Sequence, residues 1–179
     1  GSKPQPSRAA PVALQAGASL EDALLAVLGE GMRHLTANQL AAERGEDPEG
    51  VHQMRVGTRR LRSALRLFDP WLPVQAARAL TTELRWLGGE LGRARDLDVF
   101  VGELLAPLAQ SRPEDEGLAA LYGAAEAARA EARVAVRAAL RSQRYVLFEL
   151  RLGRFVEGAF KRRAQLGALA APAWSALRP

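Results

Sequence analysis

Five basic side chains follow one another at helical spacing near the middle of the sequence. Their positions are three or four residues apart, so successive members lie on one face of a helix. Guanidinium groups form planar, forked hydrogen bonds that suit phosphate oxygens, and such charge-assisted bonds are strong. The row therefore predicts a surface that binds an anion carrying several negative charges. Its members are His52, Arg55, Arg59, Arg62 and Arg66.

The basic row lies directly beside an apolar row on the same segment. At about 100° per residue, the basic positions span about 80° of the helix circumference. Basic side chains of a bundle helix usually lie opposite the core instead. Repulsion between neighbouring like charges costs the row about 1 kcal/mol. Either acidic groups on neighbouring helices or a polyanionic ligand would offset that cost. The apolar row comprises Val51, Met54, Thr58, Leu61, Leu65 and Phe68.

The composition indicates one basic globular domain. The chain has 179 residues, 48% of them hydrophobic, and a formal net charge of +5. This length suits a single domain, and the positive charge favours an anionic partner. Arginine supplies nearly all the basic side chains, since only Lys3 and Lys161 are lysine. That bias also fits a genome rich in alanine, glycine and leucine codons, but it does not explain the alignment of the row.

The sequence also bears on location. It contains no cysteine, and hence no disulfides or thiolate metal sites, which fits a reducing compartment. No apolar run is long enough to span a membrane, and the N-terminus lacks the apolar segment of a signal peptide. We therefore expect a cytoplasmic protein without a membrane partner. The residues Gly1 and Ser2 resemble the remnant of a removed tag.

Capping signals and periodicity predict an all-α fold. Ser19 and Ser142 are candidate N-caps, Asp47-Pro48 is a helix-start signal, and Gly45 ends a helix. We expect an antiparallel four-helix bundle with an additional C-terminal helix, and we expect Pro107 to end the third helix. Residues 1–18 would form a tag remnant and flexible lead-in, residues 19–170 the helical domain and residues 171–179 a tail. The expected helices span residues 19–45, 48–69, 74–105, 113–141 and 143–169.

Apolar side chains at helical spacing predict the core of this bundle, and His34 is expected to be a partly buried polar residue within the first helix. The third helix places its leucines in the core, and the fifth contributes aromatic anchors. The expected core residues are Leu24, Leu25, Leu28, Met32, Leu35, Leu40, Leu80, Leu84, Leu87, Leu91, Leu118, Leu121, Tyr122, Ala125, Ala128, Ala132, Val136, Tyr145, Phe148, Leu152, Phe155 and Phe160.

Two glycines interrupt the third helix on one side. Gly88 and Gly92 each cost about 1 kcal/mol relative to alanine in a helix interior. This loss of helix stability is explained if a neighbouring helix or a ligand approaches the third helix closely on this side. Arg95 lies on the same side, and the adjacent Asp96 and Asp98 could orient nearby arginines.

No sequence motif supports catalysis. The chain lacks a Walker phosphate loop, a G-x-G-x-x-G motif, an H-E-x-x-H motif and any cysteine pair for metal. Its two histidines are far apart in the sequence, and no nucleophile has an evident base at helical spacing. We therefore expect a protein that is not an enzyme and that has no metal and no cofactor.

Two segments resemble signatures of the CHAD domain family. The first is His52-x-x-Arg55-Val56-x-x-Arg59-Arg60-Leu61-Arg62, which resembles the opening motif of that family. The second is Leu87-Gly88-x-Glu90-Leu91-Gly92-x-x-Arg95-Asp96-Leu97-Asp98-Val99, which is similar to its second signature in sequence and spacing. A third, weaker similarity is Ser142-x-Arg144-Tyr145. The resemblance covers roughly residues 19–165.

The resemblance implies two four-helix bundles related by approximate two-fold symmetry. A basic surface and a central pore between them would bind inorganic polyphosphate. Family members often accompany a triphosphate-tunnel (CYTH) domain or associate with polyphosphate granules. This sequence resembles the first bundle plus the helix that leads into the second, and lacks the second bundle. A homodimer could replace the missing half.

We therefore expect non-catalytic binding of inorganic polyphosphate. Alternatives are a helical nucleic-acid-binding module, an accessory domain of an enzyme that processes triphosphate or polyphosphate, and a structural adaptor whose arginines pair with acidic helices. Few aromatic residues interleave with the basic row, which argues against binding of single-stranded nucleic acid. The expected polyphosphate-binding residues are His52, Arg55, Arg59, Arg60, Arg62, Arg66, Arg95 and Arg144.

Overall fold

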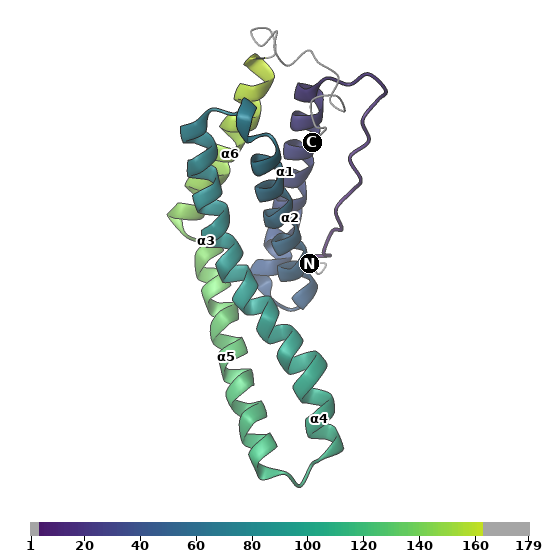
Figure 1. Ribbon diagram of the computed structural model, residues 1–179. Helices are drawn as coiled ribbons and strands as arrows, with labels where there is room; N and C mark the ends of the chain where they lie inside the picture. Colours follow the sequence, from purple (N-terminus) through teal and green to yellow (C-terminus); the bar gives the residue numbers. More distant parts are fainter. Residues whose placement is uncertain (1–3, 163–179) are drawn as a thin grey trace.

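The computed structural model describes residues 4–162, with side chains described as far as Gly158 (Figure 1). This part of the chain is all helical and contains no strand, as the sequence predicts. A short 3-10 turn, Asp69–Trp71, joins the second and third helices, and a π-helical segment, Phe100–Leu105, follows the third. The α-helices are α1 Leu20–Arg44, α2 Pro48–Leu67, α3 Val74–Val99, α4 Ala106–Ser111, α5 Glu116–Leu140 and α6 Gln143–Arg162.

The predicted capping residues act at the helix ends. The Ser19 side chain and Asp22 form a reciprocal capping box at the start of α1, and Gly45 ends that helix with a left-handed φ of 64°. Asp47 accepts a hydrogen bond from the Glu49 amide at the start of α2. The Ser142 hydroxyl oxygen accepts from the Tyr145 amide at the start of α6. These helix ends could be predicted from the sequence because each cap depends only on residues that are close together in the chain.

Helices α1, α2, α3 and α6 surround the main core, and the last turns of α5 join them (Figure 1). This differs from the expected arrangement, in which the fourth helix completed the bundle and the last helix was additional. Alanine-rich α5 runs largely beyond the bundle, whereas α6 inserts the buried anchors Tyr145 and Phe148. The aromatic side chains of α6 therefore fill the part of the core that the alanine side chains of α5 are too small to fill.

Most predicted core residues are buried, but Leu40 and Leu121 are 51% and 48% exposed, so their assignment to the core was wrong. Leu40 lies about 200° around the helix from buried Asn38, which places it opposite the packed face. Leu121 lies on the hairpin of α4 and α5, where no third helix of residues 4–162 covers it. Phe160 lies among the residues whose side chains are not described.

The third helical segment does not end at Pro107, contrary to expectation. The π-helical segment precedes α4, and Pro107 falls in the first turn of α4, directly after this change in hydrogen-bond register. The helical path consequently continues to Ser111. Val101, Leu105, Leu118 and Ala125 form a small second core between this extension and α5.

The fourth predicted helix starts later than expected. Pro113 precedes α5, and Asp115 caps the helix through its bond from the Leu118 amide at 2.9 Å. The end of α4 at Ser111 and the start of α5 at Glu116 therefore both differ from the helix boundaries predicted from the sequence. Residues 163–179, which include the expected helix end at residue 169 and the domain boundary at residue 170, lie outside the described part.

Residues 4–18, which we call the N-terminal arm, run along the outside of α1 (Figure 1). The sequence predicted a flexible lead-in here, whereas backbone groups of Ser7 and Ala10 are hydrogen-bonded to side chains of the bundle. No helix between residues 4 and 162 has the length and apolar character needed to cross a membrane.

Candidate anion-binding site

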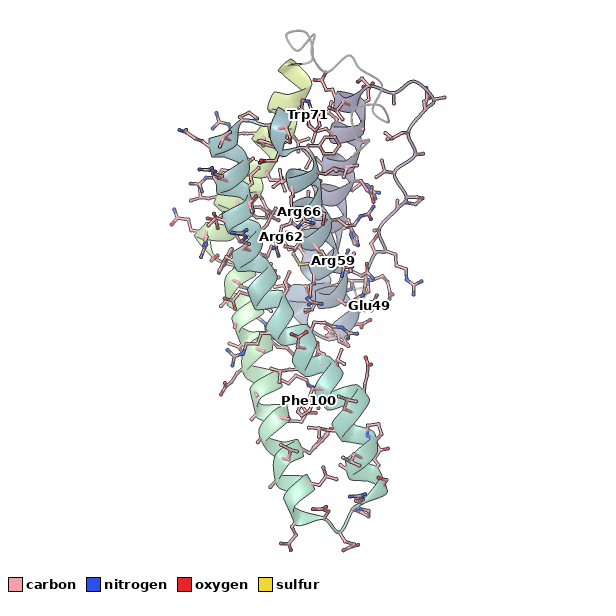
Figure 2. All side chains as sticks on the ribbon, viewed as in Figure 1. Glu49, Arg59, Arg62, Arg66, Trp71 and Phe100 are labelled. Carbon is pink, nitrogen blue, oxygen red and sulfur yellow. The ribbon has the colours of Figure 1, made fainter. Side chains whose placement is uncertain are left out.

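Helix α2 holds the basic row at the edge of the bundle. Its apolar row is buried, with Met54 and Leu61 0% exposed and Leu65 2% exposed. Burial of this face fixes the rotation of α2 about its axis. Arg59, Arg62 and Arg66 are consequently exposed along the stretch of α2 that faces α3 (Figure 2).

A groove of about 760 Å³ lies between α2 and α3. Arginines line it from both helices, and Asp69 is the only carboxylate among its lining residues. Hydroxyl groups of Ser63, Thr81 and Thr82 lie between the charges. The arrangement offers forked donors on two sides of one open channel, which suits an extended anion. Its arginines are Arg59, Arg62 and Arg66 from α2 and Arg78 and Arg85 from α3.

A smaller hollow of about 140 Å³ is lined by His52, Arg55, Arg59 and Arg62, with Gly88 of α3 at its edge. Arg59 and Arg62 line the larger groove as well, so the two spaces share a wall. The Nδ1 atom of His52 is buried and has no hydrogen-bond partner in the described structure. The predicted row is thus one continuous surface from His52 to Arg66.

The protein's own acids leave most of this row uncompensated. Within residues 4–162, no carboxylate lies within ion-pair distance of Arg59, Arg62 or Arg66. Arg55 approaches Asp96 at 4.0 Å, and the two side chains are 44% and 73% exposed. Exposed pairs of this kind contribute little to stability. Acidic neighbours therefore do not neutralise the row, which was the alternative to a bound polyanion.

Three predicted site residues line neither the groove nor the smaller hollow. The Arg60 guanidinium donates a hydrogen bond to the Ala10 carbonyl at 3.4 Å, beside the N-terminal arm. Arg95 pairs with Glu103 at 3.5 Å. Arg144 pairs with Glu83 at 2.6 Å and lies 4.1 Å above the ring of Trp86. Helical spacing identifies one face of one helix, but the partners of an arginine depend on how the helices pack.

The small residues of α3 allow α2 to approach closely. A methyl group on Gly88 would lie 3.5 Å from Thr58 Cγ2, and a methyl group on Gly92 would lie 3.7 Å from Arg55 Nε. Both contacts are with side chains of α2, so of the two expected explanations the approach of a neighbouring helix is the one observed. Gly88 accommodates the neighbouring helix, whereas Gly92 leaves space for a side chain of the basic row.

Asp98 does orient arginines, but those of α5. Its carboxylate is bonded to the Arg133 guanidinium at 2.6 Å, and Arg129 Nε lies 4.0 Å from the same oxygen. The Asp98 side chain is 2% exposed. This buried carboxylate ties α3 to α5 at the point where the hairpin leaves the bundle. The neighbouring Asp96 faces Arg55 instead, so the two acids serve different helix pairs.

The second wall of the groove was not predicted from the sequence. Arg78 and Arg85 are seven residues apart, with Thr81 and Thr82 between them at helical spacing. The same row continues to Gly88 and Gly92 on α3. That periodicity could have identified the wall, because the glycines already marked this face as the one that contacts another element.

The described part of the chain contains no group of three or more His, Cys, Asp or Glu side chains that could hold a metal ion. Apart from the carboxylate of Asp69, the polar side chains that line the groove and the smaller hollow carry guanidinium, imidazole and hydroxyl groups. These groups can bind and orient an oxyanion through hydrogen bonds and charge.

Comparisons with known proteins agree with the sequence motifs. Residues 26–179 match the CHAD domain. The crystal structure of the CHAD domain from the plant Ricinus communis is similar, with a TM-score of 0.74 and 40% sequence identity. The similarity covers 87% of this chain and 51% of that chain, so this chain spans about half the length of the plant domain. A search of curated proteins gave no match.

Proposed function

The chain belongs to the CHAD family, and from this membership and the groove we propose that it binds inorganic polyphosphate without cleaving it. The observation that supports the proposal most strongly is the arginine groove between α2 and α3. Three of its arginines have no carboxylate partner within residues 4–162, and two more face them from the opposite wall. A long anion would compensate all five.

The shape of the groove favours an extended ligand. From Arg55 to Arg66, α2 rises about 16 Å at about 1.5 Å per residue. A phosphate chain of that length would meet a donor at each turn of the helix. Short phosphates would reach only part of the row, so we propose that affinity increases with chain length until the groove is filled.

The lining also favours polyphosphate over single-stranded nucleic acid. Neither the groove nor the smaller hollow is lined by Phe, Tyr or Trp, on which proteins that bind single strands typically stack bases; the imidazole of His52 is the one aromatic ring among the lining residues. Polyphosphate has no bases and requires only charge and hydrogen-bond donors. Competition between polyphosphate and RNA of equal charge, at one salt concentration, would separate the two ligands. We expect polyphosphate to displace RNA.

The direct test is a triple variant, Arg55→Ala, Arg59→Ala and Arg62→Ala. Three charge-assisted contacts are lost, so affinity should fall at least about 100-fold, while circular dichroism should show unchanged helix content. A matched control removes the same charge elsewhere, through Arg112→Ala, Arg151→Ala and Arg154→Ala. These exposed residues lie at the hairpin tip and on α6. If both variants lost the same affinity, the groove would not be the binding site, and binding would depend only on the net charge of the protein.

The absence of catalysis is part of the proposal. Polyphosphate incubated with the protein and Mg²⁺ should keep its length distribution on a gel. Shortened chains would favour the alternative of a domain that takes part in phosphate processing. Adding a CYTH-type triphosphatase would show whether this chain delivers substrate to such an enzyme, which would appear as a lower KM without a change in kcat.

We also propose a cytoplasmic site of action at polyphosphate granules, and a second copy of the chain as partner. Phe100, Leu104 and Leu108 support the second copy, because they are exposed apolar residues at four-residue spacing along the hairpin. Figure 2 shows Phe100 on this hairpin, away from the groove. Native mass spectrometry tests the dimer, and fluorescence microscopy of a tagged chain with stained polyphosphate tests the granule.

A further inference from the structure

A ladder of polar side chains along α1 holds the N-terminal arm. Glu30, His34 and Asn38 are four residues apart, so they lie above one another on one face of the helix. The arm crosses them in the opposite direction, with Ser7 beside Asn38 and Ala10 beside Glu30. Three residues of extended chain span about 10 Å, and eight residues of helix rise about 12 Å, so the spacings of arm and ladder agree.

The hydrogen bonds recognise the arm through its backbone. The Ser7 amide donates to Asn38 Oδ1 at 2.8 Å, and Asn38 Nδ2 donates to the Ser7 carbonyl at 2.8 Å. The Ala10 amide donates to Glu30 Oε1 at 2.8 Å, and Arg60 of α2 donates to the Ala10 carbonyl at 3.4 Å. Both residues are thus held at N–H and C=O alike, in the manner of an added β-strand.

Two of the three ladder side chains are fully buried, Glu30 is partly exposed, and hydrogen bonds hold the ladder in place. Asn38 and His34 are 0% and 1% exposed, and the second Asn38 amide hydrogen is donated to the His34 carbonyl at 2.8 Å. His34 Nε2 lies 3.0 Å from both the Ser7 carbonyl and Gln53 Oε1, and a carbonyl can only accept, so Nε2 carries the proton. Gln53 in turn donates to Glu49 at 2.6 Å. The polar groups that meet the arm are therefore positioned by further hydrogen bonds within the bundle.

We propose that this α1–α2 surface is a peptide-binding site that takes an extended segment by its backbone, and that residues 7–10 occupy it in this chain. Recognition requires free N–H and C=O groups on two residues three positions apart, and it tolerates different side chains at both. Pro11 supports the bound form, because a residue that precedes proline is driven to extended backbone. The site is separate from the arginine groove and does not depend on the ligand proposed there.

A peptide added in trans tests the site directly. A variant without residues 1–16 keeps the Ser19 cap of α1 and leaves the ladder open. A labelled synthetic peptide of residues 4–16 should bind it saturably in fluorescence anisotropy. Ser7→Ala in the peptide should change affinity by less than about threefold, whereas N-methylation of the Ser7 amide should weaken it at least about tenfold, since every 1.4 kcal/mol is tenfold. Absence of binding, or equal affinity of the N-methylated peptide, would overturn the proposal.

Hydrogen exchange in the full-length chain provides a second test that needs no truncation. The Ser7 and Ala10 amides should exchange more slowly than those of Arg8 and Ala9, which have no acceptor in the described structure. Ser7→Pro removes one donor and should release the arm, so Ala10 exchanges as fast as its neighbours, while Ser7→Ala leaves it protected. Uniformly fast exchange along residues 7–10 in the wild-type chain would contradict a bound arm.

Discussion

The Arg55 side chain passes over Gly92 of α3, such that a methyl group on Gly92 would lie 3.7 Å from Arg55 Nε. This is an ordinary van der Waals distance, so the position has space for one methyl group without a shift of Arg55. The finding connects the two motifs that identify the family, because one residue comes from each. Absence of a side chain at Gly92 therefore helps to place the first guanidinium of the basic row.

Substitutions at Gly92 should consequently have graded effects on polyphosphate binding. Gly92→Ala should leave affinity within about twofold of wild type, whereas Gly92→Leu should displace Arg55 and weaken binding about tenfold, since one charge-assisted contact contributes roughly 1.4 kcal/mol. Isothermal titration with long polyphosphate measures both. Combining Gly92→Leu with Arg55→Ala should cause no further loss, and additive losses would show that Gly92 acts on something other than Arg55.

A second close approach, at Gly50, should control stability. A methyl group there would lie 2.7 Å from the backbone carbon of Ala41 and the backbone nitrogen of Ala42. Backbone atoms of α1 cannot move away without separating the helices, so Gly50→Ala should lower the free energy of unfolding by about 1–3 kcal/mol.

Gly89 provides the matched control for that change. It lies within α3, and no heavy atom would lie within 4 Å of an added methyl group. Gly89→Ala should raise the unfolding free energy by up to about 1 kcal/mol through helix propensity alone. Thermal denaturation of both variants should therefore move Tm in opposite directions. A shift in the same direction would show that the α1–α2 contact at Gly50 is looser than described.

The sequence predicted features that depend on one helix at a time. Ser19, Gly45 and Asp47 marked helix ends because capping is local, and the alignment of Arg55 to Arg66 followed from helical spacing. The sequence did not reveal that Arg60 and Arg144 lie outside the groove, because their partners, Ala10 and Glu83, are 50 and 61 residues away in the chain. No periodicity within one helix contains that information.

The second wall of the groove shows the same limit. Arg78 and Arg85 have the correct spacing for one face of α3, but only the packing of α3 on α2 brings that face opposite the basic row. The π-helical segment before Pro107 is a further example. A proline normally ends a helix, and no residue pattern near Pro107 indicated that a change in hydrogen-bond register would allow the helix to continue.

Removal of the α3 wall should weaken binding without affecting the fold. The double variant Arg78→Ala and Arg85→Ala loses two cations that line the groove, and affinity for long polyphosphate should fall at least about tenfold. Arg93→Ala with Arg112→Ala removes the same charge from exposed positions outside the lining. The proposal requires the control to bind at least several times more tightly than the groove variant at the same salt concentration.

The N-terminal arm should respond to acid through Glu30. Partial burial acts to raise the pKa of this carboxyl, but bonds from the Ala10 amide and Arg33, with the charges of Arg33 and Arg60, hold the pKa below its usual 4.5. A lowered pKa in the docked state means that docking is stabilised above pH 4.5 and is weakened as the pH falls through the lowered value. The Ala10 amide resonance should therefore shift with a midpoint below 4.5 in NMR.

Glu30→Gln is the control for this titration. The amide oxygen still accepts from Ala10, so the resonance should lose its pH dependence while the arm remains docked. The Ser7 amide, which donates to uncharged Asn38, should shift much less than the Ala10 amide in the wild-type chain. A midpoint at or above 4.5, or equal shifts at both amides, would contradict the role given to Glu30.

The salt dependence of binding tests whether Arg59, Arg62 and Arg66 are available to a polyanion. Affinity for long polyphosphate would be titrated over a series of NaCl concentrations for the wild type and for the triple variant in which these arginines are alanine. By analogy with single-stranded nucleic acids, each phosphate contact contributes about 0.7 to the slope of log affinity against log salt. We predict a steep decrease for the wild type and a slope about 2 smaller for the variant; equal slopes, or binding that is indifferent to salt, would contradict the account.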